Sequence, residues 1–464
     1  MTVVAARPVV IGGGIAGLVA AWELARAGRC PLLLERSRAV GGPVARHTVA
    51  GIELDSGAES FAIGRPAVTD LLVDLGMADA IVPPAPMAAW VRHEGGSAAL
   101  PAGALLGIPA DPLADDVVAA IGVEAAAQAA ALDARPVGTL PDSLGALVEA
   151  RMGRQVLRRL VDPVVGGVHA ADPCLLEIDA VAPGLSRAVT SSGSLAAAVR
   201  MLRGAAAPGS AVAGIDGGMA ELPRALVEQI VRFGGEIRCS TAVIRVETTP
   251  SGQRVIVGDA DGGQSVLISD LVVIACPASD LLDLTLIHPP ANDLTALGPV
   301  LPEISRTTPV TLMTLVLDDP RLDAAPRGTG VLVSRRVREI SAKALTHASV
   351  KWPWLAARLP SGRHVLRLSY GRGGSIATPD PTTVLADASA LLDVEPRPED
   401  LVGSGVVRWP SALPQARPGH LAEVRALRAS LPPGLVLIGG AVAGNGLSSI
   451  VSDARVQLGP VSGC

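Results

Sequence analysis

Apolar and polar positions change period at the start of the chain and predict a strand, a turn, a helix and a second strand. Residues 8–11 form a short apolar run, and residues 12–17 are rich in glycine. Residues 15–27 carry apolar side chains at helical spacing up to Gly28, which ends the helix. Residues 31–35 form a second strand of buried type. This opening predicts a parallel sheet that is covered by helices.

Further along, the pattern separates a helical stretch from a β-rich stretch. Residues 83–208 are rich in alanine and mostly helical in period, and 116–132 is the strongest helix. Another helix is expected at 220–233, and a last one begins near Leu447. We expect a hairpin over 253–268 and strands at 236–239, 242–248, 270–276, 308–317, 330–333, 348–352, 364–370 and 434–440.

Composition and charge exclude several classes of protein. The apolar fraction of 49% in 464 residues predicts a globular chain of two or three domains. The net charge is -5 and no basic block occurs, so nucleic acid is not an expected partner. With five Trp, two Phe and one Tyr, a pocket for a large flat ligand would be mostly aliphatic.

The cysteines predict neither a metal site nor a disulfide framework. They are odd in number, far apart and without a C-x-x-C pair, which suits a reducing cytosol; they are Cys30, Cys174, Cys239, Cys276 and Cys464. Neither a signal peptide nor a transmembrane run is recognised, so a cytoplasmic location is expected.

A G-x-G-x-x-G motif occupies the first turn. Gly12 allows a tight turn, Gly14 lets a phosphate approach the backbone, and Gly17 lets the helix pack on the strand. The free N–H groups at the helix start, around Ile15 and Ala16, then favour a pyrophosphate. Two acceptor and charge positions follow the second strand: Glu35, expected to accept from the ribose hydroxyls, and its neighbour Arg36.

Two further glycine clusters favour FAD over NAD as the dinucleotide. Gly41 and Gly42 offer a second close backbone approach, against the plainer interpretation of an ordinary loop. A late strand ends in Gly439 and Gly440 and is followed by Gly444, Gly446 and Leu447 at a helix start. Backbone N–H groups at this place would stabilise the negative charge of a reduced flavin.

Several stretches together resemble one family. They are 54–61 (LDSGAESF), 100–103 with 106–109 (LPAG, LGIP), 162–172 (DPVVGGVHAAD), 350–353 (VKWP), and 408–409 with 413–415 and 419–420 (RW, LPQ, GH). The chain resembles the oxygen-dependent protoporphyrinogen/coproporphyrinogen oxidases, within the monoamine-oxidase-type flavoprotein superfamily. The resemblance implies an α/β fold in which a Rossmann-type FAD-binding domain (GR2/amine-oxidase-like) is interrupted by a mixed β substrate domain and a helical domain.

The resemblance also implies boundaries and site residues. The FAD-binding domain would comprise 1–82, 212–285 and 430–464, the helical domain 83–211 on the substrate-entry or membrane side, and the β-rich substrate domain 286–429. The flavin contacts it adds are Gly57, Ala58, Glu59, Ser60 and the backbone of Val243. The substrate contacts it implies are Arg65, Gly167, His169 and Tyr370, against plainer interpretations as a solvated arginine, a turn glycine, a structural histidine and a core tyrosine.

The chain departs from the family pattern at three positions. Pro43 replaces a basic residue after the glycine pair, and Arg46 could take its place. His169 stands where an aromatic residue is usual. Ser448 stands where proline is usual.

The implied reaction is a six-electron oxidation of a porphyrinogen, with FAD as the cofactor and O2 as the acceptor. Coproporphyrinogen III is favoured over protoporphyrinogen IX because the Ala-, Gly- and Arg-rich composition resembles that of high-GC Gram-positive bacteria. A rim with several arginines would suit its four carboxylates; the candidates are Arg65, Arg187, Arg335, Arg336 and Arg372. An amine oxidase, a carotenoid desaturase and a flavin-binding relative without activity stay open. So do contacts with a membrane surface, with the next enzyme of haem synthesis or with a second copy of the chain.

Overall fold

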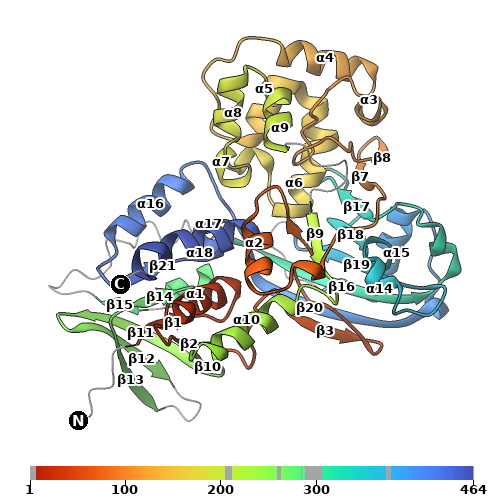
Figure 1. Cartoon of the computed structure of the whole chain (residues 1–464). Coiled ribbons are helices and arrows are strands. Elements are labelled where there is room, and N and C mark those ends of the chain that lie inside the picture. The colour runs from red at the N-terminus through yellow and green to blue at the C-terminus, as the bar shows by residue number, and fades with distance from the viewer. Residues whose placement is uncertain are drawn as a thin grey trace.

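The structure is a computed structural model that describes residues 7–203, 212–258, 263–283, 285–287, 306–372 and 378–462. Figure 1 shows three lobes: one holding β1 and α18, a helical lobe above it, and a second sheet lobe at the right. Cys464 lies outside the described residues, and so does part of the predicted boundary near 211.

A five-stranded parallel sheet forms the base of the first lobe. Its order is β10 (Glu236–Arg238), β2 (Leu32–Leu34), β1 (Val9–Ile11), β14 (Val272–Ile274) and β21 (Leu435–Leu437). The register pairs Val9 with both Leu32 and Val272. All side chains of β1, β2 and β14 are buried because elements cover both faces of the sheet.

The two faces of this sheet have different covers. On one face pack the helices α1 (Ile15–Arg26), α10 (Glu221–Arg232) and α18 (Leu447–Ser462), where Leu18, Leu226 and Val451 are fully buried. The other face meets α16 (His420–Ser430) and a smaller sheet of β11 (Ala242–Thr249), β12 (Gly252–Gly258), β13 (Gln264–Ser269) and β15 (Thr285–Ile287). The parallel sheet and the α/β fold class are the predicted ones, but helices were expected to cover the sheet and a smaller β-sheet shares one face with α16. Strand β15 spans the predicted boundary between 285 and 286.

A seven-stranded sheet builds the second lobe. Its order is β20 (Leu401–Pro414), β16 (Thr307–Asp318), β19 (Arg363–Tyr370), β18 (Ala344–His347), β17 (Gly330–Val333), β7 (Ala89–His93) and β8 (Gly96–Ala99). Helix α15 (Pro381–Leu392) packs on one face of it. Strands β7 and β8 fall within 83–211, so that range is not helical at its start.

The strand predicted at 348–352 is wrong. β18 ends at His347, and the short helices α13 (Ala348–Lys351) and α14 (Pro353–Ala356) follow it. The buried side chains of Ala348, Trp352 and Leu355 are four and three residues apart, which is a helical spacing. The long strand β20 was not predicted, because its small and polar residues give no run of alternating apolar positions.

The helical lobe contains α3 (Asp115–Ile121), α4 (Val123–Asp133), α5 (Leu144–Val156), α6 (Asp162–His169), α7 (Ile178–Val181), α8 (Leu185–Ser192) and α9 (Leu195–Arg203) around one apolar core. The single helix predicted at 116–132 is two helices, because Gly122 breaks it with a φ of 90°. Between α5 and α6 lies a π-helical turn, Leu157–Val161.

Short elements complete the three lobes and the segments between them. They are β3 (Arg46–Val49), β4 (Ile52–Asp55), β5 (Phe61–Ala62), β6 (Ile81–Val82), β9 (Val212–Ile215), α2 (Ala67–Asp74), α11 (Ala278–Asp283) and α17 (Gly440–Ala443), with 3-10 turns at Ala78–Ala80, Pro173–Leu175, Pro320–Ala324 and Pro398–Asp400. Strand β9 pairs with both β5 and β6.

Candidate flavin and substrate site

The first glycine turn has the geometry that a pyrophosphate needs. Gly12 has a φ of 104°, and a Cβ there would lie 2.8 Å from the Ala275 carbonyl oxygen. A Cβ on Gly17 would lie 1.9 Å from the Gly12 carbonyl oxygen, so only glycine lets α1 start so close to β1. Gly14, in contrast, has open space on its Cβ side. The turn is therefore tightly packed at Gly12 and Gly17 and open at Gly14, which fits a bound diphosphate.

Glu35 directly follows β2, and its carboxylate is held over this turn. One oxygen accepts from the Gly13 N–H at 2.6 Å, and the other accepts from the Ser37 N–H at 2.7 Å. Its neighbour Arg36 pairs with Asp280 at 3.0 Å. The carboxylate lies at the end of the second strand, where the ribose contact was predicted, and the contact itself stays a prediction.

The second glycine pair lies against the first turn. Gly41 forms a β-bridge with Gly14, and its N–H donates to the Gly13 carbonyl at 2.8 Å. A Cβ on Gly42 would lie 3.6 Å from the Gly14 Cα. The structure thus brings together the two glycine segments that were each predicted to let a dinucleotide come close to the backbone.

The loop after the glycine pair supports the flavin-side stretch instead of presenting a charge. The Pro43 carbonyl accepts from the Ala58 N–H at 3.0 Å, and a Cβ on Gly57 would lie 2.2 Å from it. Arg46 does not replace the missing basic residue, because its guanidinium pairs with Glu53 and Glu221.

The last segment of the chain returns to the first helix. Gly439, with a φ of 105°, would place a Cβ 3.7 Å from the Ala16 Cβ. Gly440 begins α17, and Gly446 precedes Leu447 at the start of α18. Ser448, one of the departures from the family pattern, is buried and donates to the Ala62 carbonyl at 2.8 Å. The start of α18 is thereby tied to the segment that leads to Arg65.

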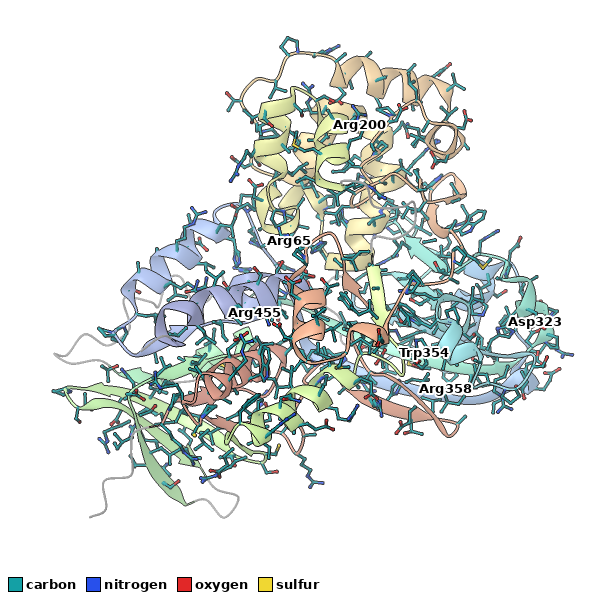
Figure 2. All side chains as sticks on the ribbon, in the orientation of Figure 1. Arg65, Arg200, Asp323, Trp354, Arg358 and Arg455 are labelled. Atoms are coloured by element: carbon teal, nitrogen blue, oxygen red, sulfur yellow. The ribbon has the colours of Figure 1, made fainter. Side chains whose placement is uncertain are left out.

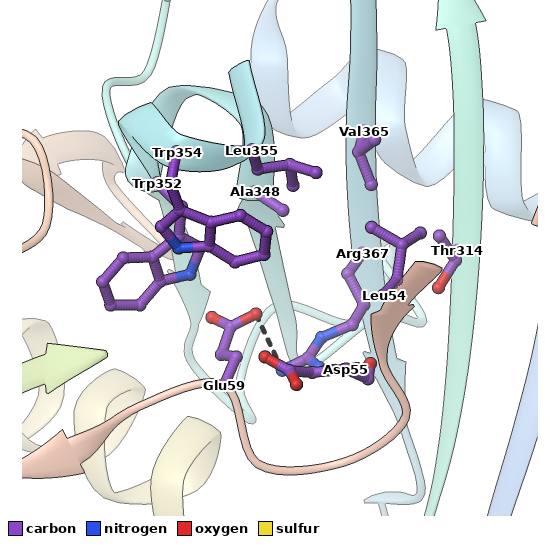
Figure 3. Close-up of a pocket in the computed structure, with 10 residues that line it drawn as sticks. All are labelled: Leu54, Asp55, Glu59, Thr314, Ala348, Trp352, Trp354, Leu355, Val365 and Arg367. Carbon is purple, nitrogen blue, oxygen red and sulfur yellow. Dashed lines mark hydrogen bonds and ion pairs between the residues drawn. The ribbon is translucent and has the colours of Figure 1, made fainter. Parts of the chain in front are cut away.

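An ion-pair network that the sequence did not reveal fixes the flavin-side stretch. Glu59 accepts from Arg367 at 2.9 Å, as Figure 3 shows, and from Lys351 at 2.8 Å. Burial opposes its charge, but the two cations lower the pKa of Glu59 to about 2. Arg367 also donates to the Gly57 carbonyl at 2.8 Å, and the Trp409 indole N–H donates to the Ser56 carbonyl at 2.8 Å.

The functional residues missed here are Lys351, Arg367 and Trp409. Lys351 and Trp409 belong to stretches that carried the family resemblance, while Arg367 had no sequence signal. Glu59 was predicted to contact the cofactor, but its carboxylate binds Lys351 and Arg367. Ser60, another predicted contact, follows it in the loop. Val243 lies half-buried in β11, so its backbone contact with adenine stays a prediction.

Arg65 is a cation without a partner among the described residues. Its guanidinium makes no hydrogen bond or ion pair with any residue that the structure describes, and partial burial lowers the pKa. Figure 2 places it where α2 and the helical lobe meet. An unpaired, half-buried guanidinium at a junction between lobes suits a ligand carboxylate.

Three other predicted substrate residues have structural surroundings. A Cβ on Gly167 would lie 2.5 Å from the Leu332 side chain, so this glycine lets α6 approach β17. His169 is buried near Lys343, and burial followed by that charge lowers the pKa of His169 to about 4. Tyr370 is buried in the core beneath α15, and its contact with the substrate stays a prediction.

Two of the arginines proposed for the rim are engaged with the protein, and two others are exposed. Arg335 pairs with Asp162 and Asp172, and Arg372 donates to four main-chain carbonyls, so both are structural. Arg187 and Arg336 are exposed.

Similarity to known proteins decides the family. The family described as "Flavin containing amine oxidoreductase" matches residues 15–456. The chain belongs to this family. It is a flavin enzyme of the oxidase type, and the FAD prediction is confirmed at the level of the family.

Its relatives agree along the whole length. Coproporphyrinogen III oxidase of Mycobacterium leprae (strain TN) is 31% identical over 464 residues and covers 96% of both chains. The enzyme of that name from Staphylococcus aureus (strain NCTC 8325 / PS 47) is 23% identical over 472 residues, covering 96% of this chain and 97% of its own. A structure from Exiguobacterium sp. 255-15, described as a protoporphyrinogen oxidase, has a TM-score of 0.80 at 26% identity over 99% of both chains.

A more distant structure supports the fold alone. Cyclohexylamine oxidase from Brevibacterium oxydans IH-35A has a TM-score of 0.70 at 17% identity and 98% coverage of both chains. In the part of the chain that the structure describes, no helix combines the length and apolar character needed to cross a membrane.

Proposed function

We propose that this flavoenzyme oxidises coproporphyrinogen III to coproporphyrin III, with O2 as the electron acceptor. The full-length similarity to coproporphyrinogen III oxidases carries the proposal. The unpaired Arg65 supports it, because the substrate presents four propionates and needs a cation to orient it. Protoporphyrinogen IX is the second candidate, because a chloroplastic protoporphyrinogen oxidase from Oryza sativa subsp. japonica is 27% identical over 497 residues.

Bound FAD supplies the redox chemistry: it takes two electrons at a time from the macrocycle and passes them to O2. Six electrons and six hydrogens leave the porphyrinogen in all, and three O2 become three H2O2. The chain's own part is to bind and orient. The turn around Gly14 would hold the diphosphate, and the start of α18 would present N–H groups to the flavin. Glu59, Lys351 and Arg367 hold the flavin-side stretch at a fixed distance from the sheet.

The direct test mixes the FAD-loaded protein with coproporphyrinogen III or with protoporphyrinogen IX in air. We expect porphyrin fluorescence to grow faster with coproporphyrinogen III, with three O2 consumed per macrocycle. Equal rates with and without the protein would refute the proposal. A clear preference for protoporphyrinogen IX would replace it with the second candidate.

Arg65 gives this proposal a residue-level test. Arg65→Met should raise KM for coproporphyrinogen III about tenfold, which corresponds to about 1.4 kcal/mol, with a smaller change in kcat. Arg232→Met, which removes an exposed arginine of α10, is the matched control and should leave KM unchanged. Identical KM values for both variants would mean that Arg65 holds no substrate carboxylate.

A further inference from the structure

A chain of three polar side chains runs from the surface of the second sheet lobe into its interior. Asp323, in the 3-10 turn Pro320–Ala324, has an exposed carboxylate, and Figure 2 places it at the outer edge of this lobe. Its Oδ1 lies 2.9 Å from the His364 Nε2, and the His364 Nδ1 lies 2.9 Å from the His347 Nε2. His364 is 6% exposed and His347 is 0% exposed, so the chain ends in a fully buried imidazole.

The partners decide where the hydrogens of this chain lie. An ionised Asp323 carboxylate only accepts, so His364 carries a hydrogen on Nε2 and, while it is neutral, a lone pair on Nδ1. His347 then donates its Nε2–H to that lone pair, which leaves its own Nδ1 as a bare acceptor. The His347 Nδ1 is buried and has no hydrogen-bond partner in the described residues. One arrangement of hydrogens therefore satisfies every ring donor of the neutral pair.

The pair has no place for further protons. A first proton on the His364 Nδ1 reverses the shared hydrogen bond and moves the His347 hydrogen to Nδ1, where a buried donor lacks an acceptor. A second proton would set two N–H groups against each other across 2.9 Å. The electrostatics agree with this geometry, because burial first and the charge of His364 second lower the pKa of His347 to about 3.

Within the described part of the chain, Asp323 is the acid that hydrogen-bonds to the pair. Its carboxylate is exposed, so water screens the attraction that it offers to an added proton. The charged groups on the elements packed around the pair are bound elsewhere: Asp318 to Arg363, Asp319 to Arg321, Asp393 to Arg327, Asp400 to Arg397, Asp387 to the main-chain N–H groups of Ser341 and Ala342, and Glu59 to Lys351 and Arg367.

The pair also anchors the start of α13. His347 is the last residue of β18 and the N-cap of α13. Ser349, inside that helix, accepts from the Val365 N–H at 3.1 Å, and its Oγ lies 3.4 Å from the His364 Nδ1. Both contacts hold α13 against β19, so a change at the His364 ring reaches the helix directly.

The end of α13 connects this pair with the flavin-side stretch. Lys351 is the last residue of α13, and its Nζ lies 2.8 Å from the Glu59 carboxylate. Trp352 follows at once and is 3% exposed, with its ring against the backbone of Gly214. One turn of helix therefore separates the histidine pair from the cation that binds Glu59.

We propose that His347 and His364 are positioning residues for the flavin, and that excess protons break their hydrogen bond and release α13. Lys351 then leaves Glu59, and the flavin-side stretch loses one of the two cations that hold it. Separated imidazoles take up protons below their ordinary pKa of 6.5, whereas buried His347 refuses one until about pH 3. FAD binding is thus intact above pH 6.5 and weakens as the pH falls from 6.5 towards 3.

Flavin titrations between pH 7.5 and 5 test this pH dependence. The parent should bind FAD at least tenfold more weakly at pH 5. In His347→Gln the amide N–H2 can donate to His364, and after a rotation the amide oxygen can accept from the protonated ring, so its Kd should change less than threefold. His347→Leu can do neither and should bind FAD more weakly than His347→Gln at pH 7.5.

His93→Gln is the matched control, because His93 is a buried histidine of the same sheet that lies outside the pair. It should keep the pH dependence of the parent. The proposal is overturned if His347→Gln loses FAD affinity in acid as steeply as the parent does, or if the parent shows no loss.

Tryptophan emission of the FAD-free protein reports the release of α13 without any activity. In the parent, the emission should move to longer wavelength as the pH falls to 5, while the far-ultraviolet circular dichroism stays constant. Trp352→Phe should lose most of this shift, and His347→Gln should not show it. A shift that persists in His347→Gln, or none before the circular dichroism changes, contradicts the proposal. None of these outcomes depends on the identity of the porphyrinogen.

Discussion

Gly14 and Gly17 belong to one turn but answer to different constraints. At Gly17 a methyl group would meet the Gly12 carbonyl at 1.9 Å, so the constraint comes from the fold. At Gly14 nothing lies within 4 Å, and the φ of -69° is open to any residue, so the protein itself does not demand glycine there. We predict that a ligand on the open side is what demands glycine at this position.

This difference predicts two distinct outcomes for alanine. Gly14→Ala should leave the unfolding free energy of the FAD-free protein nearly unchanged and weaken FAD binding tenfold or more, which is about 1.4 kcal/mol. Gly17→Ala should lower both, because α1 must move away from β1. Chemical denaturation and flavin titration measure the two effects. Normal FAD affinity in Gly14→Ala would exclude the diphosphate from this face of the turn.

His169 shows how burial links a single residue to pH. Its pKa in the folded protein is about 4, below the ordinary value of 6.5, because burial and Lys343 oppose the charge. The unfolded chain therefore binds a proton below pH 6.5 that the folded protein refuses until about pH 4. The stability is intact above pH 6.5 and falls through this window, by up to about 1.4 kcal/mol per pH unit.

Replacing this histidine should remove part of the loss of stability at acidic pH. In His169→Gln the unfolding free energy should fall less steeply than in the parent between pH 6.5 and 4, while the difference between the two proteins stays constant above pH 7. Urea denaturation across this pH range measures both slopes. Parallel curves would mean that His169 is protonated in the folded protein as readily as in the unfolded chain.

At the scale of elements, one buried carboxylate joins the helical lobe to the second sheet. Asp162, the first residue of α6, is 3% exposed and accepts from Ser334 Oγ, from the Arg335 N–H and from its guanidinium at 3.0 Å. Asp172 binds the same guanidinium at 2.9 Å from a more exposed position. The two acids therefore share a partner. Water could take the place of the more exposed Asp172 carboxylate more easily than that of the buried Asp162 carboxylate.

The two acids should respond differently to removal. Asp162→Ala should lower the unfolding free energy by about 3 kcal/mol, because it leaves buried donors unsatisfied. Asp172→Ala, the matched control, should cost about 1 kcal/mol. Equal losses in denaturant unfolding would show that Asp162 does not anchor α6.

On the scale of the whole molecule, the flavin site gathers segments from most of the chain. In the five-stranded sheet, β1 near residue 9 lies beside β14 near residue 272, and β14 in turn lies beside β21 near residue 435. Gly439 then meets Ala16, and the start of α18 meets Ala62. A ligand that contacts all of these segments binds the folded state alone and stabilises all of it together.

FAD should therefore raise the global stability of the protein. At a concentration of 100 times its Kd, FAD should add about 2.7 kcal/mol to the unfolding free energy. NAD at the same concentration is the control and should add nothing. Thermal unfolding of the flavin-free protein with each nucleotide makes the comparison, and equal shifts would contradict the choice of FAD.

The sequence by itself determined the local elements and the nucleotide turn, because glycine spacing and hydrophobic period act over a few residues. The residues around Gly14 and Glu35, the glycine pair at Gly41 and Gly42, and the helix start at Leu447 were all predictable on that basis. It did not determine the helix at Ala348–Lys351 or the break at Gly122, where context overrides short patterns.

Only the tertiary structure decided which charges are free and which are engaged. Arg46, Arg335 and Arg65 look alike in sequence, yet Arg46 and Arg335 pair with carboxylates whereas Arg65 has no partner in the part of the chain that the structure describes. Partners that lie hundreds of residues apart, such as Glu59 and Arg367, leave no local trace. Ion pairing and burial depend on distances in space, and a chain fixes these distances only when it packs.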